Sequence, residues 1–155
     1  MYVFDASSFI VLSHYFPERF PSFWEKLEQS VADSQIISVR EVLNELTNDA
    51  SKPHLQEWIG TNKKIFLPPN QDETIFVGQI FAIPHFQYLV TQKQRLKGTP
   101  VADPFVIASA KIRNACVVTE EQKKSNAARI PNVCDHFYVD YTNLEGFMAR
   151  ENWEF

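Results

Sequence analysis

Short apolar runs alternate with stretches of helical periodicity along the chain. The runs Tyr2–Phe4, Gln35–Ser38, Ile65–Pro69, Ala115–Thr119 and Phe137–Val139 are three to five residues long, which predicts brief buried strands. Strands of this kind between helices are typical of a parallel sheet that is covered on both faces. The pattern therefore predicts an α/β fold, with three α/β/α layers around a mostly parallel sheet of four to five short strands.

Helices are predicted between the apolar runs, because apolar residues there recur at intervals of three and four residues. Ser38 and Glu41 have the spacing of a capping box, Gly60 ends one helix, and Gly98 to Pro100 interrupt the pattern. The predicted helices cover 7–15, 21–33, 38–49, 53–59, two stretches within 73–96, 103–114 and 142–152.

One apolar stretch, Thr74–Gln92, has no formal charge and is almost long enough to cross a bilayer. Gln79, Pro84, His85 and Gln87 interrupt it, so two buried helices that meet near Pro84 explain it better than a membrane span. The opening residues contain no basic segment, and no signal peptide is predicted. The sequence thus predicts a cytoplasmic protein with no membrane contact.

The composition is globular and favours one domain over residues 1–155, with 45% hydrophobic residues and four glycines. Cys116 and Cys134 lack metal-ligand spacing and are interpreted as reduced core thiols, and the four histidines also lack ligand spacing. No glycine-rich loop with a lysine is present, which argues against a P-loop nucleotide hydrolase. The run after the first strand lacks the second aspartate of a haloacid-dehalogenase-type phosphatase.

Charge is distributed unevenly, although the net charge is only −4. Residues 93–129 contain eight basic and three acidic residues, or +5, and the remainder of the chain carries −9. This asymmetry indicates a surface that faces a polyanion, and solvated helix faces would produce it too.

Acidic residues lie where parallel strands end or where the following helices begin. Asp5 ends the first strand, Glu120 and Glu121 end the fourth, Asp103 opens a helix, and Glu45 lies on the helix after the second strand. Because active crevices of parallel sheets lie outside the carboxyl ends of the strands, we expect these carboxylates to converge. Oxygen ligands suit Mg²⁺ or Mn²⁺. Each acid also has a structural alternative: Asp103, before Pro104, has the placement of a helix cap, and Asp5 would cap the first helix.

These residues resemble the motifs of PIN-domain proteins, and most of all the small VapC-type toxin ribonucleases. The motifs are "YVFDASS", "ISVREVLNEL", "ADPFVIASA" and "VVTEE", which occur in the family's order. The resemblance assigns catalytic and metal-binding roles to Asp5, Glu45, Asp103 and Glu121. Two consecutive glutamates stand where the family commonly has one aspartate, so Glu120 and Glu121 both remain candidates for the fourth acid.

The same resemblance implies supporting roles for the hydroxyls of Ser7 and Thr119, beside the metal ligands. It implies a metal-dependent endoribonuclease that uses Mg²⁺ or Mn²⁺, leaves a 5′-phosphate and a 3′-hydroxyl, and is neutralised by a co-expressed antitoxin. A homodimer is also implied. Basic residues would hold the RNA backbone, namely Lys93, Arg95, Lys97, Lys123 and Lys124. Two alternatives stay open: a catalytically idle PIN-like module that binds RNA or protein, and a nuclease for DNA or for particular nucleic-acid structures.

Overall fold

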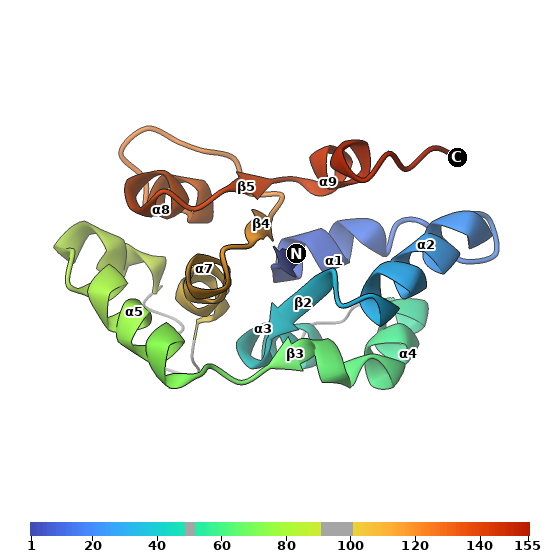
Figure 1. Cartoon of the computed structure of the whole chain (residues 1–155), viewed down its shortest axis with the longest axis horizontal. Coiled ribbons are helices and arrows are strands. Elements are labelled where there is room, and N and C mark those ends of the chain that lie inside the picture. The colour runs from blue at the N-terminus through green and yellow to red at the C-terminus, as the bar shows by residue number, and fades with distance from the viewer. Residues whose placement is uncertain (49–51, 91–100) are drawn as a thin grey trace.

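The chain forms an α/β fold around one parallel sheet, as a computed structural model shows for residues 1–48, 52–90 and 101–155 (Figure 1). The strand order is β3-β2-β1-β4-β5, and every neighbouring pair is parallel. The strands are β1 (Tyr2–Phe4), β2 (Ile36–Val39), β3 (Phe66–Leu67), β4 (Cys116–Val118) and β5 (Tyr141–Thr142). The predicted three-layer α/β/α fold with a central parallel sheet is confirmed.

Helices cover both faces of this sheet. In Figure 1, α5, α7 and α8 lie on one side of the strands, and α1, α2, α4 and α9 lie on the other. The helices are α1 (Ala6–Leu12), α2 (Pro21–Ala32), α3 (Arg40–Asn48), α4 (Pro53–Thr61), α5 (Gln71–Phe81), α7 (Ala102–Arg113), α8 (Ile130–Phe137) and α9 (Leu144–Arg150). Two 3₁₀ helices, η1 (Lys63–Ile65) and η2 (Pro84–Leu89), complete the described elements.

The core lies between the sheet and these helices and is rich in phenylalanine. Phe4, Phe9 and Phe147 are completely buried, and the Phe4 ring lies 5.6 Å from Phe9 and 5.2 Å from Phe147. The adjacent strands β1 and β4 are buried on both faces except at Tyr2, which explains why their residues form unbroken apolar runs in the sequence. The aromatic residues of the sequence thus serve mainly as core, as is usual for phenylalanine.

Two features predicted from the sequence differ from the structure. Phe137–Val139 is not a strand, because α8 extends to Phe137 and Tyr138 then adopts a left-handed backbone with φ of 57° that ends the helix. The strand forms three residues later, as β5. The predicted capping box at Ser38 is wrong, because Ser38 belongs to β2 and its hydroxyl donates to the Phe4 carbonyl at 2.6 Å.

The uncharged stretch that starts at Thr74 contains most of α5 and the whole 3₁₀ helix η2, with a break just before Pro84. Residues 91–96, at the end of the predicted helical stretch, lie outside the described residues. In the part of the chain that the structure describes, no helix has both the length and the apolar character needed to cross a membrane.

Two helical glycines have opposite surroundings, which gives a test of the packing. A methyl group on Gly78, in α5, would meet nothing within 4 Å, whereas one on Gly146, in α9, would lie 2.0 Å from Thr142 Oγ1. We expect Gly78→Ala to raise the free energy of unfolding by about 0.5–1 kcal/mol, because alanine restricts the unfolded chain and favours helix. Gly146→Ala should lower it by about 1–3 kcal/mol through overpacking. Urea denaturation of both variants measures this, and a gain in stability for Gly146→Ala would contradict the packing of α9 on β5.

Candidate functional site

The candidate site lies where the winding of the sheet reverses. The chain proceeds from β1 outward through β2 to β3, then returns to the other side of β1 to form β4 and β5. In open α/β sheets, the crevice at such a reversal, beyond the carboxyl ends of the strands, is where ligands bind. Phe4 pairs with Val118 at the ends of β1 and β4, so Asp5 and Thr119 follow side by side.

Asp5 is buried and held by hydroxyl and backbone donors. Thr119 Oγ1 donates to Asp5 Oδ2 at 2.7 Å, and Ser7 Oγ lies 2.8 Å from both carboxylate oxygens. The Ser8 backbone N–H donates to Oδ1 at 2.9 Å, which makes Asp5 the N-cap of α1. Burial raises the pKa of Asp5, and the four hydrogen bonds from Thr119, Ser8 and Ser7 oppose that rise. The carboxylate that caps α1 is therefore the same one that is proposed to bind a metal ion.

Ser8 also contacts Asp5, and the sequence analysis did not identify it as a site residue. Its hydroxyl lies 3.0 Å from Asp5 Oδ1 and 2.7 Å from the Val118 carbonyl, so it links α1 to the end of β4. Its position three residues after a strand-ending aspartate is the available signal, since an N-cap side chain meets the third residue of its helix.

Asp103 lies in the first turn of α7 and is surrounded by negative charge. Burial raises the pKa of its carboxyl well above the ordinary value. Three negative charges raise this pKa further, and they belong to Glu121, Glu45 and Asp5. The other three acids that the resemblance selected, which lie up to 98 residues from Asp103 in the sequence, are thus close enough to act on it electrostatically.

The expectation that Asp103 caps its helix is wrong. Helix α7 begins one residue earlier, at Ala102, and its N-cap residue Val101 makes no side-chain hydrogen bond to the first turn. Instead, Glu45 Oε1 in α3 accepts a hydrogen bond from the Ala102 N–H at 3.1 Å. A glutamate from another helix therefore satisfies this donor, and the Asp103 carboxyl remains beside the other acids.

The two consecutive glutamates face different helices. Glu121 Oε2 accepts from the Ile130 N–H at the start of α8, at 2.9 Å, and Glu120 Oε1 accepts from the Leu144 N–H at the start of α9, at 2.7 Å. Glu121 is among the charges that raise the Asp103 pKa, and Glu120 is not. The arrangement thus places Glu121 in the acidic cluster with Asp103, and Glu120 against α9.

This cluster offers oxygen donors and excess negative charge, which is the chemistry that a hard divalent cation requires. Among residues 1–48, 52–90 and 101–155, however, no three His, Cys, Asp or Glu side chains form a group that could ligate one metal ion in this arrangement. Mg²⁺ in proteins is commonly held by one or two carboxylates and keeps several waters. The observation at this site is therefore the crowding of negative charge around the carboxyl of Asp103.

Glu41 differs from Glu45, the other acid of α3. It is buried, its Oε1 pairs with Arg40 at 2.9 Å, and within the described structure its Oε2 has no hydrogen-bond partner. It is not among the charges that raise the Asp103 pKa. Glu45, one turn later, is the acid of α3 that interacts with Asp103.

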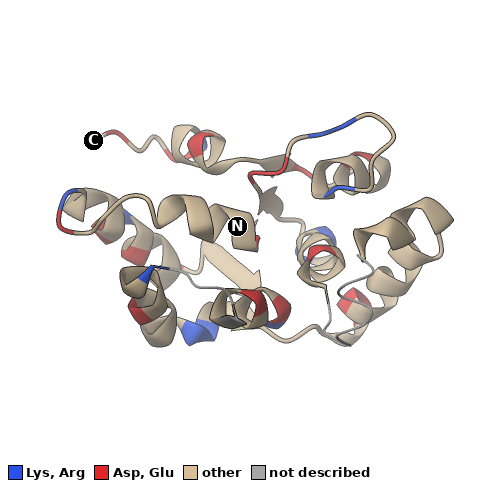
Figure 2. Ribbon diagram, turned by 180° about the vertical axis from the view of Figure 1, so that it is seen from behind, with Lys and Arg blue, Asp and Glu red and all other residues tan. Residues whose placement is uncertain are grey.

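The basic residues are only partly placed. Lys93, Arg95 and Lys97 lie outside the described residues, whereas Lys123 and Lys124 are exposed in the loop between β4 and α8. Lys123 pairs with Asp135 of α8. Figure 2 shows basic positions on the loop that joins β4 to α8, and acidic positions around the strand ends and on α3 and α7. This loop begins with the residues that include Glu121, and Lys123 follows two residues later.

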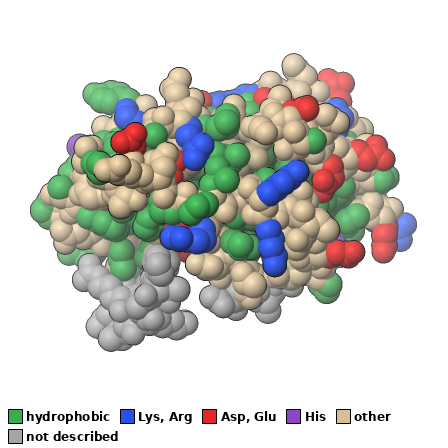
Figure 3. All heavy atoms as spheres, turned by 60° about the horizontal axis from the view of Figure 1, so that its bottom comes forward, with side chains coloured by type: hydrophobic (Ala, Val, Ile, Leu, Met, Phe, Trp, Pro, Cys, Tyr) green, Lys and Arg blue, Asp and Glu red, His purple; other side chains and the backbone are tan. Residues whose placement is uncertain are grey.

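A second feature is a groove of about 790 Å³ between α2 and α4. Trp24, Trp58 and His54 line it, and the Trp58 indole N–H is buried without a hydrogen-bond partner in the described structure. Three glutamates also line it, namely Glu25, Glu28 and Glu57. Figure 3 shows acidic side chains at the end of the molecule where α2 and α4 lie. The groove therefore combines aromatic surface with negative charge.

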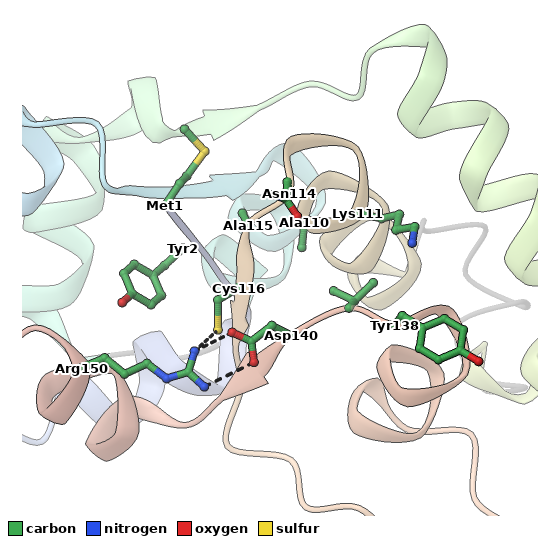
Figure 4. A pocket seen from close by; sticks show the side chains of 11 residues that line it. Met1, Tyr2, Ala110, Lys111, Asn114, Ala115, Cys116, Tyr138, Asp140 and Arg150 are labelled. Atoms are coloured by element: carbon green, nitrogen blue, oxygen red, sulfur yellow. Dashed lines mark hydrogen bonds and ion pairs between the residues drawn. The ribbon is translucent and has the colours of Figure 1, made fainter.

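A smaller hollow, of about 370 Å³, lies where the strands begin, at the end of the sheet opposite the acidic cluster (Figure 4). There Arg150 Nη1 lies 2.6 Å from Asp140 Oδ2 and 3.1 Å from Cys116 Sγ. Burial raises the pKa of the Cys116 thiol to about 12, so the thiol stays protonated and is a poor nucleophile. Cys116 and Cys134 are both buried and unpaired, as predicted for reduced core thiols.

Comparison with known proteins identifies a family but no activity. The family model described as "Domain of unknown function (DUF4411)" matches residues 2–155. No curated protein matches the sequence. Since the match covers almost the whole chain, the protein belongs to this DUF4411 family of unknown function.

Proposed function

We propose that the protein is a divalent-ion-dependent endoribonuclease and the toxin of a toxin–antitoxin pair. One observation carries this proposal: the Asp103 carboxyl lies within the electrostatic influence of Asp5, Glu45 and Glu121, at the reversal point of a parallel sheet. Carboxylates crowded in this way repel each other unless a cation neutralises them. The motif resemblance to VapC-type ribonucleases supplies the reaction and the RNA substrate.

In this proposal Asp5 and Asp103 hold the ion, Glu45 and Glu121 add negative charge beside it, and the hydroxyls of Ser7 and Thr119 orient Asp5. When bound, Mg²⁺ or Mn²⁺ offsets charge on the scissile phosphate and lowers the pKa of the attacking water. The high pKa of Asp103 implies that its carboxyl releases a proton when a cation binds. Cleavage would leave a 5′-phosphate and a 3′-hydroxyl.

RNA would approach along the basic segment of the chain. Lys123 and Lys124 lie two and three residues after Glu121, in the exposed loop between β4 and α8, so we expect the RNA backbone to contact this basic loop beside the acidic cluster. Lysine contacts to phosphates add affinity without sequence preference. Lys93, Arg95 and Lys97 stay predicted contributors to this surface.

An antitoxin is the proposed protein partner. The groove between α2 and α4 offers aromatic side chains together with Glu25, Glu28 and Glu57, which favours a partner segment with apolar and basic side chains. An antitoxin bound in this groove would contact a surface that contains none of the four acids of the cluster. A homodimer stays a prediction that rests on the resemblance.

An idle PIN-like module is the second candidate, and one observation favours it. Glu45 and Glu121 each already accept a hydrogen bond from a helix N-terminal N–H, at 3.1 Å and 2.9 Å, so both carboxylates have a structural use. If that use were their whole role, the protein would bind RNA or a partner without cleaving.

Cleavage assays on matched single-stranded RNA and DNA distinguish these functions. We expect Mg²⁺- or Mn²⁺-dependent cleavage of RNA, its loss in EDTA, and its loss in Asp103→Asn. Asp72→Asn, at an exposed aspartate in the first turn of α5, serves as the control that should retain activity. Equally low, ion-independent activity in wild type and Asp103→Asn would favour the idle module, and cleavage of DNA alone would indicate a DNA nuclease.

A further inference from the structure

We infer that Glu120 is a positioning residue, which directs Glu121 towards Asp103 by anchoring the Thr119–Glu121 turn to α9. The catalytic consequence rests on the proposed nuclease function, whereas the anchoring itself rests on hydrogen bonds. The inference assigns different roles to two consecutive glutamates that the sequence leaves equivalent.

The backbone of the turn is tied to Asp5 through two hydroxyl groups. The Glu120 N–H donates to Ser7 Oγ at 2.9 Å, and the Glu121 N–H donates to Thr119 Oγ1 at 3.1 Å. Each hydroxyl in turn donates its proton to the Asp5 carboxylate, at 2.8 Å and 2.7 Å. Both hydroxyls therefore accept from the turn and donate to Asp5, which fixes the direction of each hydrogen bond.

The two side chains leave the turn towards different helices. Glu120 Oε1 accepts from the Leu144 N–H, one of the donors at the start of α9 that have no partner within the helix. Helix α9 is held at its other end as well, because Tyr2 OH donates to Glu151 Oε1 at 2.6 Å. Glu120 thus connects the turn to a helix that is itself fixed to β1.

Anchoring Glu120 determines where Glu121 lies. The backbone of the turn is bonded to Ser7 and Thr119, and Glu120 is bonded to α9, so the Glu121 side chain is left on the side of α8, where it accepts from the Ile130 N–H. Without the Glu120 side chain, the turn loses its contact with α9 and Glu121 loses part of its restraint. Because Glu120 needs only an acceptor oxygen for this role, its negative charge is dispensable.

Three variants separate positioning from ligation: Glu120→Gln, Glu120→Ala and Glu121→Gln. Glutamine keeps the acceptor oxygen, so Glu120→Gln should bind Mn²⁺ within about twofold of wild type and retain RNA cleavage. Glu120→Ala should weaken Mn²⁺ binding about tenfold, as loss of a group that orients a metal ligand does. Glu121→Gln should weaken it by at least about tenfold, because it removes a charge beside Asp103.

Mn²⁺ affinity is measured by calorimetry, independently of cleavage, together with hydrogen exchange of the Leu144 and Glu121 amides. We expect faster exchange of both amides in Glu120→Ala and unchanged exchange in Glu120→Gln. In the cleavage assay Glu120→Ala should lower kcat with KM for RNA unchanged, because the turn acts on the acidic cluster.

Two results would overturn the inference. If Glu120→Gln weakened Mn²⁺ binding as much as Glu121→Gln does, the negative charge of Glu120 itself would be needed. Glu120→Ala with unchanged Mn²⁺ affinity and unchanged exchange of the Glu121 amide would mean that Glu120 positions nothing. A wild-type protein that cleaves no RNA but shows the expected amide exchange and Mn²⁺ affinities would instead refute the proposed function and leave the positioning role supported.

Discussion

Replacing Asp103 by asparagine is expected to reduce ion-dependent RNA cleavage by roughly a thousandfold, which is the scale of losing one electrostatic element of an active site. Asparagine keeps the size and one oxygen of the side chain but removes the charge on which the cation site is centred. The measurement is a single-turnover cleavage rate in saturating Mn²⁺, compared with wild type and with the exposed-site control Asp72→Asn. A loss of less than about threefold would show that Asp103 is not part of the reaction centre.

The same variant should be more stable than wild type when no cation is present. The folded-state pKa of Asp103 is raised above its ordinary value of 3.8, so ionising this carboxyl costs stability in the folded protein. At a pH below the ordinary value both states hold the proton, and wild type and Asp103→Asn should melt alike. As the pH rises through the raised pKa the wild type loses stability, and the advantage of Asp103→Asn becomes complete above that pKa.

Melting curves in EDTA between pH 4 and 8 measure this difference in stability. In a protein of this size, each kcal/mol shifts the melting temperature by about 2–4 °C. Mn²⁺ should stabilise wild type more than Asp103→Asn, because it binds the native state of wild type more tightly. An advantage for Asp103→Asn that is as large at pH 4 as at pH 8 would contradict the crowding of carboxylates around Asp103.

Replacing Asp5 by alanine is expected to destabilise the fold by about 2–4 kcal/mol. The change removes the N-cap of α1, worth about 1 kcal/mol, and leaves buried donors of Ser8 and Thr119 without their acceptor, at about 1–3 kcal/mol. The melting temperature should fall by roughly 5–15 °C. Asp5→Asn keeps one acceptor oxygen and should lie between wild type and Asp5→Ala in stability, yet bind Mn²⁺ as weakly as Asp5→Ala.

Thermal unfolding and Mn²⁺ calorimetry of both variants therefore separate the two uses of Asp5. Ser7→Ala is the matched control, since it removes one of several donors to the carboxylate and should cost about 1 kcal/mol. A melting temperature of Asp5→Ala equal to that of wild type would contradict the buried network that joins β1 to β4.

The strands were predictable where burial on both faces makes an unbroken apolar run. Tyr2–Phe4 was predicted with the bounds that it has, and Cys116–Val118 lies within its predicted range. The fifth strand was misplaced because Phe137 and Val139 are apolar for another reason: Phe137 is the last residue of α8, and Val139, two residues later, is buried in the core. Local periodicity cannot separate such a helix end from a strand, because both present a few consecutive apolar residues.

The candidate site shows the same division between local and distant contacts. The placement of Asp5 and Glu121 at strand ends follows from the apolar runs before them, and the parallel sheet brings these ends together. The cap of α7 was assigned to Asp103 from sequence, yet it comes from Glu45, 57 residues away along the chain. Likewise, Glu120 and Glu121 differ through contacts with Leu144 and Ile130, which no spacing within "VVTEE" reveals.

Diffraction from crystals soaked in Mn²⁺ at neutral pH shows whether these acids form one cation site. We expect an anomalous manganese peak within about 2.5 Å of an Asp103 carboxylate oxygen, with Asp5 or Glu121 as a further ligand directly or through water. Crystals of Asp103→Asn should lack the peak. A peak elsewhere in the wild-type protein, or none beside Asp103 at saturating Mn²⁺, would mean that the acids do not form such a site.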